Sequence, residues 1–305
     1  MVLKSPLHIS GIRCILFGSW VAVSVLLFLR PIIGLVQYAL HNDSASHVLL
    51  IPFLALGVLY HDRQIVFRRV SYDLPLAAFF LILSVIFMSW TLHSDTRWSP
   101  TSYLTRYTLA LVLSWIAGFA FFFGRSAVVA GRFSLLFLLL TIPLPESALN
   151  GVIYWLQTGS ADVSEIVFDL TGVPVLRDGL VFHLPRLSIE VARECSGIRS
   201  SMAIFILALL AGHLYLGRLW KQVVFQVCGL FIMVVKNGVR IVTLTLLANY
   251  VDPGILFGNL HREGGIVFFL LGLVLLLPVL GLLRRGEDAR GKSIDLPTAE
   301  VVSKS

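Results

Sequence analysis

Long apolar runs separated by short polar segments make up most of the chain. A helix that crosses a bilayer needs about 20 predominantly apolar residues. Six runs meet this requirement clearly: Cys14–Leu29, Leu74–Leu92, Tyr107–Phe123, Ser196–Leu216, Val223–Tyr250 and Gly264–Leu283. Two more are weaker, because Val48–Tyr60 is short and Phe133–Leu149 is interrupted by two prolines. The pattern predicts an all-α polytopic membrane protein with about eight transmembrane helices, the first of them retained rather than cleaved as a signal peptide.

One long segment between the predicted spans, 150–194, differs from the rest. Its first part, about Val152–Leu170, mixes apolar and acidic residues, which is typical of a helix lying on the membrane. Asp178-Gly179 between two apolar runs predicts a β-hairpin. Residues 187–192 alternate apolar and polar side chains like a further strand. A small helix and β-hairpin element is therefore expected before the sixth span.

Composition and charge support this class and set the orientation. The chain of 305 residues is 57% hydrophobic and only 13% charged, with a net charge of +7. Basic residues gather in alternate connections, as the positive-inside rule describes, so they do not indicate nucleic-acid binding. We expect both termini in the cytoplasm and segments 150–194 and 252–263 outside. The connections predicted to be cytoplasmic, together with the two termini, hold the larger number of basic residues: Lys4, Arg13, Arg63, Arg68, Arg69, Arg125, Arg132, Arg218, Lys221, Arg284, Arg285, Arg290, Lys292 and Lys304.

Cys195 lies between the predicted β element and the sixth span. The first N–H groups of a helix and its dipole favour a thiolate at this position. Ser196 is a candidate N-cap, and Glu194 a candidate partner for a neighbouring arginine. Arg199 in the first turn opposes the helix dipole, so we expect it to stabilise the thiolate or to hold a substrate oxygen.

Two further polar residues reach the same predicted membrane face. Arg240 is 17 residues beyond Val223, or about 26 Å along a helix, which places it near the outer boundary. Lys236 lies one turn deeper, next to Asn237, and ionisable groups within spans usually have a task. His261 precedes the last span and is suited to proton transfer near neutral pH. A thiol, a cation and an imidazole are what thiol acyl transfer needs.

Each of these residues also has a structural interpretation. A cysteine in a membrane helix is usually a small apolar filler, which is how we interpret Cys14 and Cys228. An arginine near an interface often extends its charge to water, and a loop histidine is usually solvated. No spacing of cysteine or histidine indicates a zinc site, so we expect neither metal nor cofactor.

At these residues the sequence resembles the exosortase/archaeosortase family. The family's three signatures correspond here to Cys195-Ser-Gly-Ile-Arg199, Asn237-Gly-Val-Arg240, and His261 ahead of the last span. The resemblance is strongest over 140–269 and includes Ile142-Pro-Leu-Pro145. The chain departs from the family where Val48 follows Ser46-His47 in place of glycine, which leaves a role for His47 open.

The resemblance implies a membrane-embedded cysteine transpeptidase or endopeptidase in the bacterial inner membrane. Cys195 would be the nucleophile, Arg240 the transition-state stabiliser and His261 the general acid/base, with Arg199, Ser196, Asn237, Glu194 and Lys236 in support. The implied substrates are secreted proteins with a C-terminal PEP-CTERM-like signal, which combines a short motif, a transmembrane helix and a basic cluster. The acceptor of the cleaved protein stays open. Residues 1–283 are expected to form the membrane domain, and 284–305 a disordered cytoplasmic tail.

Two other functions fit an apolar chain of this kind. A transporter would bind an anionic substrate through Arg240 and Lys236 and would show a polar path or repeated, broken helices. A non-catalytic scaffold for exopolysaccharide export would leave Cys195 unreactive. We find no internal repeat, and the inner halves of the spans are mostly apolar.

Overall fold

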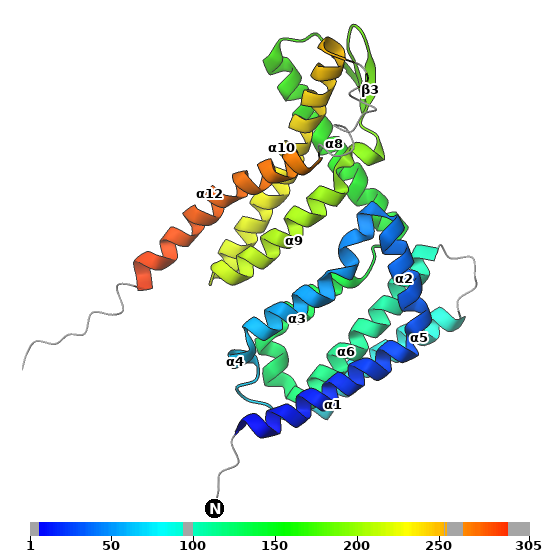
Figure 1. Ribbon diagram of the computed structural model, residues 1–305, viewed down its shortest axis with the longest axis vertical. Helices are drawn as coiled ribbons and strands as arrows, with labels where there is room; N and C mark the ends of the chain where they lie inside the picture. Colours follow the sequence, from blue (N-terminus) through cyan, green and yellow to red (C-terminus); the bar gives the residue numbers. More distant parts are fainter. Residues whose placement is uncertain (1–5, 94–99, 253, 255–264, 292–305) are drawn as a thin grey trace, which may run out of the picture. The chain divides into compact units, whose positions relative to one another are not determined.

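The computed structural model describes residues 6–93, 100–252, 254 and 265–291 (Figure 1). Six helices in these ranges are long and apolar enough to cross a membrane, and up to eight spans result if each of two bent helix pairs counts as one. The protein is therefore an all-α polytopic membrane protein. The chain divides into two compact units, 1–151 and 152–305.

The first unit is a helical bundle around α6. In the apolar window of α6, 78% of the residues are buried, whereas in that of α5 only 17% are, so α6 is central and α5 faces outward. Helices α1 and α5 both pack on α6. The elements are α1 (Pro6–Leu27), α2 (Leu29–His41), η1 (Asp43–Leu49), α3 (Ile51–His61), α4 (Arg63–Val66), α5 (Leu74–His93), α6 (Pro100–Ala130), α7 (Arg132–Phe137) and η2 (Leu138–Thr141).

The second unit combines three packed helices with a small sheet. Helices α9, α10 and α12 pack against one another (Figure 1). A separate apolar cluster joins α8, β2 and α10 through Phe168, Phe182 and Val242. The elements are α8 (Glu146–Thr171, which starts in the first unit), β1 (Leu176–Asp178), β2 (Val181–His183), β3 (Ser188–Glu190), η3 (Arg193–Ser196), α9 (Ile198–Tyr215), α10 (Leu219–Tyr250) and α12 (Gly265–Gly291).

The sheet matches the prediction from alternation and turn residues. Strands β1 and β2 are antiparallel and pair Asp178 with Val181, so Gly179 and Leu180 form the turn. Strand β3 pairs with β2 and leads directly into η3. Arg177 of β1 joins the sheet to α8 by ion pairs of 2.8 Å to Asp162 and 2.6 Å to Glu165. Burial lowers the pKa of Arg177, but these hydrogen bonds outweigh it and raise the pKa overall.

Two helix boundaries differ from the prediction. The first helix ends at Leu27, two residues before the predicted Leu29, but no loop follows, because α2 begins at Leu29 and is bent by 78° from α1. Pro31 is accommodated in the first turn of α2, where its missing N–H costs no helical hydrogen bond. The predicted boundary at Leu149 and Asn150 falls inside α8, which begins at Glu146 after a bend of 96°. The Pro143-Leu144-Pro145 segment supplies this break.

Helix α12 continues to Gly291, so the first residues of the predicted disordered tail, from Arg284, are helical. The other residues of that tail, 292–305, lie outside the described residues.

Candidate active site

Cys195 occupies a single turn of 3-10 helix between the sheet and α9. Its backbone N–H donates to Ala192 O at 2.9 Å, and its side chain is partly buried and not in a disulfide. Gly197 then takes a left-handed conformation with φ 68° and ψ 20°, and α9 begins at Ile198. The thiol therefore lies just before the N-terminus of an 18-residue helix, where N–H groups without helical partners favour an anion.

The predicted N-cap is wrong by one residue. Gly197, not Ser196, occupies the N-cap position of α9, and no side chain caps the helix there. The left-handed Gly197 reverses the chain before the helix starts, so Ser196 points inward instead. Its side chain is completely buried, and its Oγ has no hydrogen-bond partner among the described residues.

Asn237 of α10 holds the turn that carries Cys195. Its Nδ2 donates to Cys195 O at 2.9 Å and to Ser160 Oγ of α8 at 3.0 Å. Three separate segments therefore meet at one amide that is 1% exposed. The sequence singled out Asn237 but not Ser160. Ser160 and Ser164 lie four residues apart on α8, and such small residues are typical of close helix contacts in membranes.

The close approach of α8 and α10 depends on small residues on both helices. A Cβ at Gly238 would lie 2.6 Å from Val163 Cγ1 and 3.1 Å from Ser160 O. Ser164 Oγ lies 3.3 Å from Gly238 O across the same contact. The close contact brings Ser160 Oγ within hydrogen-bond distance of Asn237. Asn237 therefore links the turn that carries Cys195 to α8.

Arg240 and Lys236 approach the site from α10. Arg240 interacts electrostatically with both Cys195 and Lys236. Lys236 is 1% exposed, and its ammonium donates a hydrogen bond to Ser200 Oγ of α9. Cys195, Asn237, Arg240 and Lys236 are thus brought together in the second unit. A thiol beside a guanidinium at a helix start is suited to nucleophilic attack.

Three other predicted site residues are placed less fully. Arg199 lies in the first turn of α9, but its side chain is exposed. Glu194 belongs to η3, and its side chain is not among the described ones. His261 lies outside the described residues.

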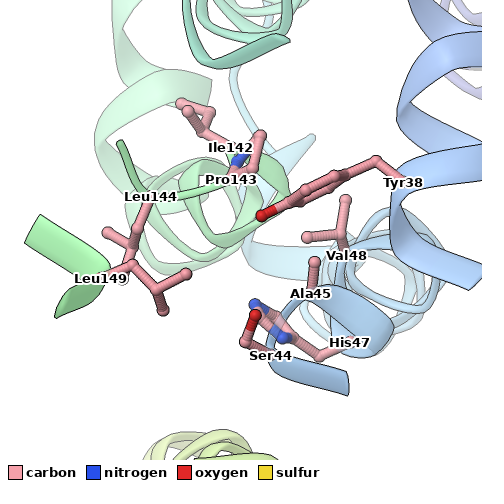
Figure 2. A pocket seen from close by; sticks show the side chains of 9 residues that line it. All are labelled: Tyr38, Ser44, Ala45, His47, Val48, Ile142, Pro143, Leu144 and Leu149. Atoms are coloured by element: carbon pink, nitrogen blue, oxygen red, sulfur yellow. The ribbon is translucent and has the colours of Figure 1, made fainter. Parts of the chain in front are cut away.

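His47 lines a small pocket in the first unit. The pocket has a volume of about 20 Å³, which is enough for a single water molecule. Figure 2 shows the Tyr38 hydroxyl directed into it, with Pro143 and Leu144 on the other side. The buried Nδ1 of His47 has no partner among the described residues, so a water at this position would satisfy it.

Replacing Gly197 with Ala is expected to damage the site more than its size suggests. A left-handed conformation costs an alanine about 1–2 kcal/mol, and the new Cβ would lie 2.6 Å from Asn237 Oδ1. We expect a loss of about 1–3 kcal/mol in the free energy of unfolding, with slower alkylation of Cys195. Thermal unfolding in detergent and mass spectrometry of the alkylated chain measure both.

The control is Gly212→Ala in the last turn of α9, where a Cβ would meet Phe225 Cδ1 at an ordinary 3.6 Å. This change should stabilise the helix by up to about 1 kcal/mol. Equal, small effects of the two substitutions would show that the turn at Gly197 tolerates a side chain and does not constrain Cys195.

Comparison with known proteins identifies the family. The sequence model described as "Transmembrane exosortase (Exosortase_EpsH)" matches residues 39–278, which is more than half of the chain. The match runs through both compact units and includes Cys195, Asn237, Arg240 and His261. No curated protein and no solved structure matches the chain. The protein, with its apolar helices and its cysteine at a helix start, belongs to the transmembrane exosortase family.

Proposed function

We propose that the protein is a membrane-embedded cysteine transpeptidase or endopeptidase. It cleaves the C-terminal sorting signals of secreted proteins through a thioester intermediate. The observation that carries this proposal is the partly buried Cys195 at a helix start, outside any disulfide, which interacts electrostatically with Arg240 and has its carbonyl held by Asn237. A filler cysteine in a membrane helix needs none of these partners.

The proposed reaction has two acyl-transfer steps. The Cys195 thiolate attacks the carbonyl carbon of the scissile peptide, and Arg240 stabilises the resulting oxyanion. The C–N bond then breaks, the leaving amine takes a proton from His261, and the substrate's N-terminal portion stays on Cys195 as a thioester. An acceptor amine or water attacks this thioester, His261 takes its proton, and the thiolate is regenerated.

The proposed substrates and location follow from family membership. The substrates are secreted proteins whose C-terminal PEP-CTERM-like signal includes a transmembrane helix and a basic cluster. We place the enzyme in the bacterial cytoplasmic membrane, with both termini in the cytoplasm and Cys195 at the outer face. A substrate helix in the same bilayer would present its cleavage motif at the depth of Cys195.

Trapping the covalent intermediate tests this mechanism. Purified protein in detergent is mixed with a synthetic peptide that carries a candidate motif, quenched in acid and digested for mass spectrometry. We expect the peptide's N-terminal fragment attached to Cys195, and neutral hydroxylamine should release it as a hydroxamate, as it does for thioesters. Product formation that continues after Cys195 has been fully alkylated would rule out the thiol mechanism.

A further inference from the structure

Lys236 is a buried cation within a membrane-spanning helix. Its side chain is 1% exposed, so it does not extend its charge to water. Among the described residues, its ammonium has a single hydrogen-bond acceptor, the Ser200 hydroxyl on α9. Ionisable groups within spans are costly and are retained mainly where they have a function. The contact of Lys236 with Ser200 is therefore a candidate functional interaction.

The hydrogen bonds of Lys236 lead to the turn that carries Cys195. Ser200 Oγ accepts from Lys236 and donates to Gly197 O at 3.1 Å. The neighbouring residue, Asn237, donates directly to Cys195 O at 2.9 Å. Two consecutive residues of α10 thus hold two carbonyl groups of the same short turn, one directly and one through a hydroxyl.

Helix α12 fixes the stem of Lys236 from another side. A Cβ at Gly272 would lie 2.6 Å from Ile204 Cδ1 and 3.8 Å from Lys236 Cγ, so α12 approaches both α9 and α10 closely there. This packing leaves the aliphatic part of Lys236 little freedom to move. The ammonium is therefore held in place against Ser200 by three helices.

We infer that Lys236, acting through Ser200, is a positioning residue that fixes the Cys195 turn against α10. The inference rests on the proposed role of Cys195 as the nucleophile. A thiol keeps its reactivity only while it stays at the start of α9 and beside Arg240, because both favour the thiolate. Without Lys236, the turn keeps the bond from Asn237, and Gly197 O keeps its bonds from Ser201 N and Ser200 Oγ, but Ser200 is no longer tied to α10. The start of α9 is then free to shift against α10, and the thiol moves away from the groups that activate it.

Lys221 provides a matched control on the same helix. It is also a buried lysine, 4% exposed, and its ammonium donates to Leu283 O of α12 at 2.6 Å. Fifteen residues separate it from Lys236, or about 22 Å along α10. Removing either ammonium is expected to destabilise the helix packing, but only the change at Lys236 should alter Cys195.

The experiment measures alkylation of Cys195 by iodoacetamide in the full chain, with Cys14 and Cys228 replaced by Ser, between about pH 6 and pH 10. For Lys236→Met and Ser200→Ala we expect alkylation near neutral pH to slow by about tenfold, with the profile moved to higher pH. Ser200→Thr keeps a hydroxyl and should preserve the rate. Lys221→Met should lower the melting temperature but leave the profile unchanged.

Each outcome is decisive for the inference. A lowered melting temperature with an unchanged profile in both Lys236→Met and Ser200→Ala would make Lys236 a purely structural residue and overturn the inference. If Lys236→Met does not fold, Ser200→Ala alone carries the test, since it removes only a hydroxyl. Alkylation requires no substrate, so a shifted profile supports the inference even if peptide cleavage is never seen, in which case the proposed function alone would fail.

Discussion

Cys195→Ala is expected to abolish the processing of a co-expressed sorting substrate. Alanine has no nucleophile to form the thioester, and neither Arg240 nor the start of α9 replaces it. Removing the nucleophile of an enzyme that works by covalent catalysis lowers kcat by roughly 10⁴- to 10⁶-fold. Because Cys195 lies in a short turn and is only partly buried, its loss should change the free energy of unfolding by less than about 1 kcal/mol. The variant should therefore fold and reach the membrane.

The measurement is immunoblotting for the shortened substrate, with the membrane level of each variant determined in parallel. Cys228→Ala is the control, since Cys228 is also a free, partly buried thiol but lies within α10. It should process the substrate normally. Equal processing by wild type and Cys195→Ala would reject the thiol mechanism and favour the transporter or the scaffold.

Most helices could be predicted from the sequence because burial in lipid imposes a length on every spanning segment. The run at Leu74–Leu92, for example, corresponds to α5 (Leu74–His93). The two bent pairs could not be predicted in the same way. Hydropathy reports how apolar a segment is but not the direction of its helix axis. It therefore predicts neither the 78° bend before Leu29 nor the 96° bend before Glu146.

Some residues of the candidate site could be singled out from the sequence, but their contacts could not. Counting residues along the spans placed Cys195 and Arg240 at one face, and the two interact in the structure. The partners Ser160 and Ser200 depend on how α8 and α9 are rotated about their axes, which apolar periodicity leaves open when a helix is hydrophobic on all sides. A serine in such a helix gives no sign of which neighbour it meets.

The N-cap shows a different limit. Serine is a more common N-cap than glycine, so local propensity predicts Ser196 at this position. The observed start at Ile198 depends on the left-handed Gly197, whose side chain position is filled by the Asn237 amide. The contact between Gly197 and Asn237, which are 40 positions apart in the sequence, therefore favours glycine at this N-cap. Such a long-range contact cannot be predicted from local propensity.

Arg240→Met is expected to lower kcat by about 10²- to 10³-fold while leaving the KM for a peptide substrate nearly unchanged. In the proposed mechanism the guanidinium meets a full negative charge only when the carbonyl oxygen becomes an oxyanion, and losing one such donor costs about 3–4 kcal/mol in the transition state. Arg240→Lys keeps the charge but loses the planar fork, so it should recover only part of the rate. Arg284→Met, an exposed arginine near the end of α12, is the control and should behave as wild type.

Steady-state kinetics with a fluorogenic peptide in detergent separates the two parameters. If Arg240→Met has a raised KM and an unchanged kcat, the lost interaction was equally strong in the enzyme–substrate complex and in the transition state. Arg240 would then be a substrate-binding residue rather than the stabiliser of an oxyanion. A loss confined to kcat, together with normal unfolding, would instead place the guanidinium at the reacting carbonyl, because the oxyanion that forms there exists only in the transition state and the tetrahedral intermediate.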